Sequence, residues 1–248
     1  FFSKEKKAFL KEIESPIPIL EGESPDEAII RAVNSREGKT LGVDAPLTLP
    51  PCLGHTDCPG ARTCDRPATA WMRQEAVRQK WGRLPVPYAQ RPVDFLLRGP
   101  WQEESLVPFP VDDSFGAGRA PLAARMQFLG NKLGPKLIEV NPRLALSGIS
   151  HWYGFSAREV RRSRDVEEGV EQRMGLLDAL SQPPRFDAIP HMFLYKTDIT
   201  ALAQDLSAFD AFLCAFMALA GEAGLLDEPP FPSEWGNVAK PMRLKGRP

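Results

Sequence analysis

Three acidic residues interrupt segments that are otherwise apolar, and they are the first candidates for chemistry. Asp44 directly follows a short apolar run, Glu139 lies inside a second one, and Asp210 breaks a long apolar helical segment. A buried ionised carboxylate costs free energy unless a cation, a hydrogen-bond donor or water meets it. If the three carboxylates share one site, a divalent cation would neutralise their repulsion, and oxygen ligands favour Mg²⁺ or Mn²⁺. Such a cluster suits two-metal hydrolysis of a phosphodiester bond.

Each acid also has a structural interpretation. Asp44 could be a helix cap or a turn former. Glu139 could form a buried salt bridge with Arg143 or Lys136. Asp210 falls at the margin of the apolar stripe of its helix, so a helix laid across a sheet could direct it toward the strand ends. Convergence of the three acids is therefore an expectation that competes with these local roles.

Alternating helices and strands must position these acids. The expected elements, in chain order, are a helix opened by the capping box at 24–27, a strand at 40–43, a helix from Pro121 closed by Gly134, a strand at 136–140, a helix from Ser156 that is charged and solvent-exposed through Arg173 and then turns apolar, and a helix at about 200–220. This alternation predicts a mostly parallel sheet, with ligands at the carboxyl ends of its strands. Asp44 and Glu139 would lie at two such ends.

A loop rich in proline and glycine at about 50–66 carries a second group of candidate ligands. Cys52, His55, Cys58 and Cys64 are close enough in the sequence to bind one Zn²⁺, which would order a segment with few core-forming residues. Their spacing is not a standard zinc pattern. A disulfide between two of the three cysteines is the alternative, although the reducing cytoplasm, which is the expected compartment, disfavours it.

Four arginines are candidates for binding a phosphate group of a substrate, because a guanidinium group donates paired hydrogen bonds to phosphate oxygens. They are Arg91, Arg119, Arg125 and Arg143.

Length and charge restrict the broad class of the protein. The chain has 248 residues, 31 basic and 32 acidic, and its formal net charge is −1. This balance gives no global field that would attract nucleic acid or an anionic membrane, so any basic binding surface must be local. No apolar stretch approaches the roughly 20 residues that span a bilayer, and no secretory segment begins the chain. We therefore expect one cytoplasmic domain over 1–248.

Three segments carry a family resemblance. Residues 42–50 (GVDAPLTLP), 138–142 (IEVNP) and 209–215 (FDAFLCA) look like signature segments of a widespread family, domain of unknown function 429, whose members are predicted to be ribonuclease H-like nucleases. The resemblance implies an α/β fold with a ribonuclease H-like central mixed sheet flanked by helices. It also implies that Asp44 and Glu139 end two strands and that Asp210 reaches the site from the last helix.

The resemblance also implies a first strand that carries a further aspartate near the start of the chain. No segment before Ser24 fits that pattern. Either the N-terminal hairpin is absent from this chain or the site is incomplete.

Taken together, these patterns predict a divalent-metal-dependent nuclease that acts on nucleic acid, with Asp44, Glu139 and Asp210 as the Mg²⁺ or Mn²⁺ ligands. The alternative is a non-catalytic binding module on the same fold, with the cysteine loop as a metal-stabilised interaction surface. A fold alone does not choose between the two.

Overall fold

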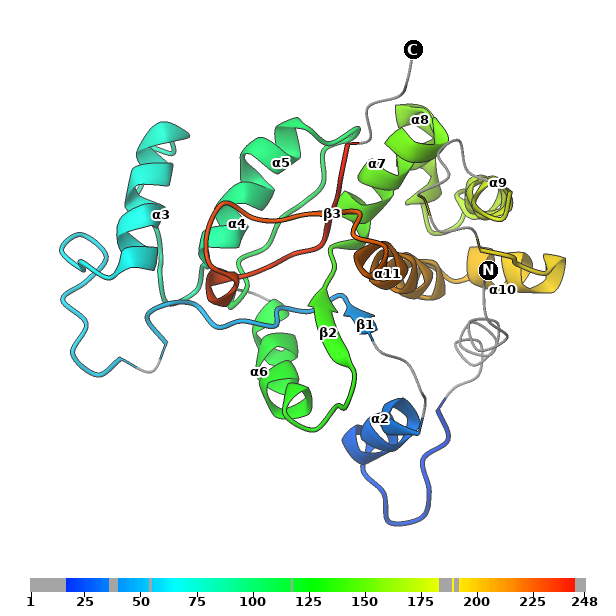
Figure 1. Cartoon of the computed structure of the whole chain (residues 1–248), viewed down its shortest axis with the longest axis horizontal. Coiled ribbons are helices and arrows are strands. Elements are labelled where there is room, and N and C mark those ends of the chain that lie inside the picture. The colour runs from blue at the N-terminus through cyan, green and yellow to red at the C-terminus, as the bar shows by residue number, and fades with distance from the viewer. Residues whose placement is uncertain are drawn as a thin grey trace. The chain divides into compact units, whose positions relative to one another are not determined.

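A computed structural model describes residues 17–35, 40–53, 55–116, 118–182, 189 and 192–243 (Figure 1). Its contacts divide the chain into two compact units. Unit 1 contains the described residues up to Asp44, those of 132–227 and those from Ala239 on, and unit 2 contains those of 45–131 and 228–238. The expectation of one domain stays a prediction. The expectation about an N-terminal hairpin falls on residues that lie largely outside the described ones.

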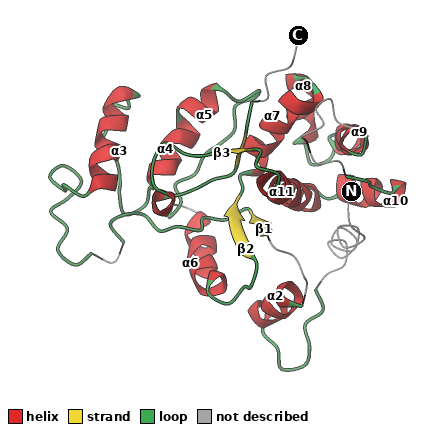
Figure 2. Ribbon diagram, viewed as in Figure 1, coloured by secondary structure: helices red, strands yellow, loops and turns green. Residues whose placement is uncertain are grey.

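Unit 1 combines helices with short strands, as Figure 2 shows, and its strands form two pairs. Its elements are α2 (Pro25–Asn34), β1 (Thr40–Val43), β2 (Lys136–Glu139), α7 (Pro142–Tyr153), α8 (Ala157–Ser163), α9 (Val170–Leu180), α10 (Lys196–Gln204), α11 (Leu206–Glu222), β3 (Leu226–Asp227) and β4 (Lys240–Pro241). The capping box that opens α2 forms as predicted, because the Ser24 side chain accepts from the Glu27 amide while the Glu27 carboxylate accepts from the Ser24 amide.

The predicted strands β1 and β2 form and pair in parallel, from Thr40 with Lys136 to Val43 with Glu139. The α/β class is therefore confirmed. In the described part of the chain this parallel sheet has two strands, and β3 and β4 form a separate antiparallel pair. The larger ribonuclease H-like sheet implied by the resemblance is not confirmed by these strands.

Helix α11 packs directly on β1 and β2. A Cβ atom added to Gly42 would lie 2.7 Å from the carbonyl carbon of Cys214, and one added to Gly221 would lie 3.8 Å from the Ile138 side chain. Gly42 thus lets the backbones of β1 and α11 approach closely. Since Gly42 and Ile138 are register partners, α11 covers the face of the sheet to which both point.

The prediction of one charged helix from Ser156 through Arg173 is wrong. Helix α8 ends at Ser163, α9 begins at Val170, and Arg173 is fully buried. The Arg173 guanidinium donates to the carbonyl oxygens of Ser163, Val166 and Ala203, at 2.8, 3.1 and 2.6 Å. An arginine that satisfies backbone carbonyls inside the fold cannot be distinguished by pattern from one on a solvated helix face.

The last predicted helix is also two helices. Asp205 separates α10 from α11 and caps α11, because its carboxylate accepts hydrogen bonds from the amides of Ser207 and Ala208. The apolar stripe of the predicted helix continues through α11, which buries Phe209, Phe212 and seven further residues. The helical spacing predicted for these apolar residues is confirmed in α11, but the helix start at Asp205 is not predicted from the sequence.

Unit 2 is built from helices and long loops. Its elements are α3 (Pro67–Arg78), α4 (Pro92–Arg98), α5 (Pro100–Glu103), α6 (Arg119–Gly130) and a short 3₁₀ helix at Ser233–Trp235. Met72, Ala76 and Phe95 form one cluster of its core, and Trp71 and Trp81 pack against that cluster. Segment 228–238 joins this unit through Phe231, whose ring meets the Trp71 ring edge to face at 5.0 Å.

No single helix among the described residues combines the length and the apolar composition needed to cross a membrane. Taken together, α10 and α11 meet that criterion, but they are bent by 118° at the break between them.

Candidate functional site

Asp44 and Asp210 both lie near Cys214 of α11. Asp44 directly follows β1, two residues after Gly42, the residue at which α11 approaches the strand. Asp210 lies one helical turn before Cys214, the residue that Gly42 contacts. Burial raises the pKa of the Cys214 thiol, and the charges of Asp44 and Asp210 raise it further. Both carboxylates are therefore within electrostatic range of one thiol.

Two arginines join these carboxylates. Arg164, directly after α8, holds Asp210 through two ion-paired hydrogen bonds, the second of them 2.8 Å long between Nη2 and Oδ2. Arg143, in the first turn of α7, has its pKa lowered by burial and by the charge of Arg164, against the opposing effect of Asp210 and Asp44. We call these four residues, Asp44, Asp210, Arg143 and Arg164, the acid–arginine cluster.

The two arginines differ in how they are held. The Arg164 side chain is 14% exposed, and its Nε atom is buried without a hydrogen-bond partner in the part of the chain that the structure describes. Arg143 is half-buried at the start of α7, a helix that Asn141 caps by accepting from the amides of Arg143 and Leu144. The backbone of Arg143 is thus held by the helix cap, while the guanidinium group of Arg164 is held by Asp210.

Glu139 lies elsewhere. It pairs with Val43 in the register of the two strands, and side chains alternate between the two faces along a strand. Glu139 is therefore directed to the face opposite Gly42, Ile138 and α11. It is 3% exposed, and its backbone carbonyl accepts from the amide of Ala239 at 2.7 Å. The structure brings Asp44 and Asp210 together and directs Glu139 to the face opposite α11.

The cysteine loop belongs to unit 2. Cys52 and Cys64 are buried, Cys58 is exposed, His55 is half-buried, and all the cysteines are free thiols. The Sγ atoms of Cys52 and Cys58 are 4.0 Å apart, which is about twice the length of a disulfide bond. Burial raises the pKa of the Cys52 thiol. A zinc ion at these residues stays a prediction, which elemental analysis of the purified protein would test.

The three remaining arginine candidates also belong to unit 2. Arg91 is 1% exposed and donates to the hydroxyls of Thr48 and Ser114, at 2.9 and 2.5 Å, and to the carboxylate of Asp94 at 3.3 Å. This buried network ties Arg91 into the core rather than offering it to a ligand. Arg119 begins α6, and Arg125 is exposed on the same helix.

A divalent cation does not fit the acid–arginine cluster in this arrangement. Among the described residues, no group of three or more histidine, cysteine, aspartate and glutamate side chains is arranged to hold a metal ion. Both carboxylate oxygens of Asp210 are engaged by Arg164. The positive charge beside Asp210 comes from a guanidinium group.

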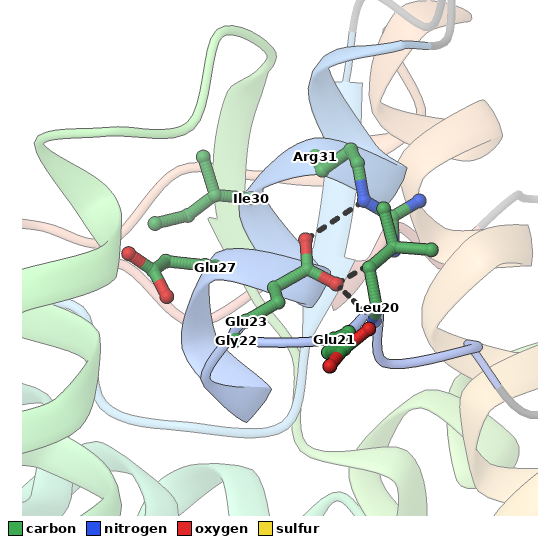
Figure 3. Close-up of a pocket in the computed structure, with 7 residues that line it drawn as sticks. All are labelled: Leu20, Glu21, Gly22, Glu23, Glu27, Ile30 and Arg31. Carbon is green, nitrogen blue, oxygen red and sulfur yellow. Dashed lines mark hydrogen bonds and ion pairs between the residues drawn. The ribbon is translucent and has the colours of Figure 1, made fainter.

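A depression beside α2 carries charged residues outside this cluster (Figure 3). Glu23, Glu27 and Arg31 line part of it. Arg31 donates to both oxygens of Glu23, at 2.8 and 2.9 Å, and these bonds, together with the Leu20 amide, lower the pKa of Glu23 to about 2. Glu23 and Arg31 thus satisfy each other, and Glu27 accepts hydrogen bonds from Ser24, so these charged groups have structural roles.

The model of a family described as "Protein of unknown function (DUF429)" matches residues 27–234. The chain belongs to this family. The match includes β1, β2 and α11, and therefore all three segments on which the sequence resemblance rests. No curated protein and no solved structure gives a significant match to this DUF429 chain.

Sequence reasoning missed Arg164, the residue that completes the cluster. Its partner Asp210 is 46 positions away, and no local pattern connects them. The available signal was the four arginines within 158–164, which are followed by Asp165.

Proposed function

We propose that the chain is a nuclease that hydrolyses phosphodiester bonds at the acid–arginine cluster. The observation that carries this proposal is the ion pair of Arg164 with Asp210 and the position of Arg143, which lies within electrostatic range of that pair and of Asp44. Each of the four residues comes from a different part of unit 1, namely the end of β1, helix α7, the residue after α8, and helix α11. We also propose that the fold is ribonuclease H-like, as the family resemblance implies.

The residues of the cluster have chemistry suited to this reaction. Arg143 is the guanidinium group for phosphate, because within the described residues no side chain or carbonyl accepts a hydrogen bond from it. Asp44 is exposed and can accept the proton of an attacking water. The water oxygen bonds to phosphorus, the bond to the leaving oxygen breaks, and that oxygen takes a proton from solvent.

Dependence on Mg²⁺ or Mn²⁺ forms the second part of the proposal. Carboxylate oxygens are the donors that these cations prefer. Asp210 could serve as a ligand only after leaving Arg164, and Glu139 would have to act from the opposite face of the strand pair. The metal requirement is therefore tested separately from hydrolysis.

The second candidate is a non-catalytic binding module on the same fold. The ion pair between Arg164 and Asp210 favours it, because a carboxylate that is fully engaged in the fold has a structural role. The same experiment separates the two candidates.

The test measures cleavage of labelled single-stranded DNA, duplex DNA and RNA with Mg²⁺, with Mn²⁺ or with a chelator. We expect Asp44→Asn to lose at least about 100-fold in cleavage rate, since general acid–base catalysis alone contributes that much. Asp210→Asn should also cleave more slowly, because it removes the charge that holds Arg164 in the cluster. Asp178→Asn is the matched control, because Asp178 is exposed on α9 and is not a member of the cluster. Equal cleavage by wild type, Asp44→Asn and Asp210→Asn would end the nuclease assignment and leave the binding module.

A further inference from the structure

The segment 59–83 of unit 2 is strongly basic although the whole chain is not. It carries six basic residues, Arg62, Arg66, Arg73, Arg78, Lys80 and Arg83, against the two acids Asp65 and Glu75. Six positive and two negative charges give this segment a net charge of +4, while the chain as a whole carries −1. The structure describes all of these residues, which lie on and beside α3.

Two of the six basic residues are partly used inside unit 2. Arg73 donates to the carbonyl oxygen of Ala61 at 2.9 Å and also to that of Cys64, and so fixes the cysteine loop to α3. Arg78 donates to the carboxylate of Glu75 at 2.5 and 2.7 Å, but its side chain is still 66% exposed. Glu75 itself is buried, so its charge is covered by Arg78 and Gln79.

The other four basic residues face solvent without a carboxylate partner. Within the described ranges of the chain, no aspartate or glutamate lies at ion-pair distance from Arg62, Arg66, Lys80 or Arg83, and only Trp81 meets one of them. With Arg78 they are the exposed basic residues on and beside α3, which we call the α3 basic surface: Arg62, Arg66, Arg78, Lys80 and Arg83.

Lys80 occupies a backbone conformation that favours glycine. Its φ is +54°, and it follows α3 at the position where the amides of Lys80 and Trp81 bond back to the carbonyls of Val77 and Ala76, at 3.0 and 2.9 Å. This bonding pattern closes many helices, usually with glycine at the left-handed position. A lysine there adds a positive charge to the surface at the expense of backbone strain.

Arg83 is held on the same surface by an aromatic ring. Its guanidinium carbon lies 5.4 Å from the centre of the Trp81 ring, which stacks at 4.3 Å on the Phe95 ring. Stacking on a tryptophan orients a guanidinium group and leaves its N–H groups available to a phosphate.

We propose that the α3 basic surface binds the sugar–phosphate backbone of nucleic acid. The choice of nucleic acid among polyanions rests on the proposed nuclease function, and the surface charge stands independently of it. Helix α3 has 12 residues and is therefore about 18 Å long, a span that faces about five phosphates of one duplex strand. The surface supplies the local basic region that the balanced charge of the whole chain lacks.

The test measures binding of fluorescent single-stranded and duplex oligonucleotides to the full chain by anisotropy, in the presence of a chelator so that no cleavage occurs. We expect the triple variant Arg62→Glu, Arg66→Glu and Arg83→Glu to bind at least about tenfold more weakly than wild type, with a shallower dependence on salt. A triple variant with glutamine at the same positions should lose less affinity, and it serves in place of the glutamate variant if that one fails to fold.

The matched control reverses Arg158, Arg161 and Arg162, which are exposed on α8. It changes the net charge equally, in a region where the five arginines of 156–173 are balanced by five acidic residues. Equal weakening by both triple variants, no oligonucleotide binding by wild type, or equally tight binding of polyglutamate would overturn the proposal. Oligonucleotide binding without cleavage would contradict the nuclease function but not the binding surface. Full cleavage activity in the triple variant would contradict the binding surface but not the nuclease function.

Lys80→Gly adds a second readout that a merely structural role would not produce. Glycine relieves the strain at this position, so the midpoint of thermal unfolding should rise by about 2–4 °C. The same change removes one charge of the surface, so oligonucleotide affinity should fall. A variant that is more stable and binds as tightly as wild type would remove Lys80 from the surface.

Discussion

At the scale of single residues, the sequence predicts where charge interrupts apolar structure but not what neutralises it. Asp44 and Asp210 were chosen because a charge in an apolar element needs a partner. The structure brings these two together and adds Arg164 from a distant segment. Glu139 passed the same test, yet the strand register directs it to the face opposite α11. Only the pairing of strands reveals that difference, because the sequence of one strand does not define its faces.

Tyr153 gives a prediction about pH. Its hydroxyl is buried, and the described part of the chain provides it with no hydrogen-bond partner. Burial raises the pKa of Tyr153 to about 12, above the ordinary value of about 10 for the unfolded chain. Folding therefore favours the neutral phenol, so its contribution to stability is fully present below pH 10 and is lost as the pH rises toward 12.

We expect Tyr153→Phe to be about as stable as wild type at pH 7, or more stable by up to about 1 kcal/mol, because it removes an unpaired polar group. Its stability should also decline less between pH 10 and 11. Urea unfolding at these three pH values measures both effects, with Tyr195→Phe as the exposed control. A clear loss of stability at pH 7 would mean that the hydroxyl has a partner.

At the scale of elements, the position of α11 on the strand pair decides the geometry of the cluster. The strands were predicted to within one residue, because apolar runs bounded by turn residues mark buried strands well. The α8–α9 break was missed because Arg173 looks like a surface residue in the sequence. The close approach at Gly42 was also missed, since a glycine inside a strand has several possible causes.

Gly42→Ala tests this approach. Its new methyl group would lie 2.7 Å from the carbonyl carbon of Cys214, and backbone cannot move aside as a flexible side chain can. We expect a loss of about 3 kcal/mol in the free energy of unfolding, because overpacking of a well-packed core costs that much.

The matched control is Gly175→Ala on α9. An added Cβ there meets no atom within 4 Å, and alanine is the better helix former, so this variant should gain about 0.5–1 kcal/mol. Chemical denaturation of both variants gives the comparison. Equal stability of Gly42→Ala and wild type would show that α11 does not rest on β1 as described.

At the scale of the whole molecule, the sequence predicts the fold class and the net charge. It does not predict which segments belong to which unit. The alternation of helices and strands was enough for the α/β class, and the short signature segments were enough for the DUF429 family. The return of residues 228–238 to unit 2 has no local signal, because it depends on contacts with residues more than 100 positions away. The assignment of residues 228–238 to unit 2 therefore follows from tertiary packing alone.

Phe231→Ala tests how much unit 2 depends on that return. Phe231 provides the ring that Trp71 meets, and Trp71 in turn packs on the Met72, Ala76 and Phe95 cluster. Because Phe231 is half-buried, we expect a loss of about 2 kcal/mol, less than for a fully buried ring. Hydrogen exchange of the α3 amides should quicken, whereas Glu234→Ala, an exposed change in the same segment, should leave it unchanged. Unchanged exchange in Phe231→Ala would show that this segment does not support α3.

The residues around Ala239 also determine when the protein can finish folding during its synthesis. The amide of Ala239 bonds to the carbonyl of Glu139, and the carbonyl of Met242 accepts from the Trp152 indole, both at 2.7 Å. A ribosome adds about 5 to 20 residues each second, so β2 waits roughly 5 to 20 seconds for the partner that Ala239 provides. During that interval a growing chain holds α7 and β2 without these two hydrogen bonds.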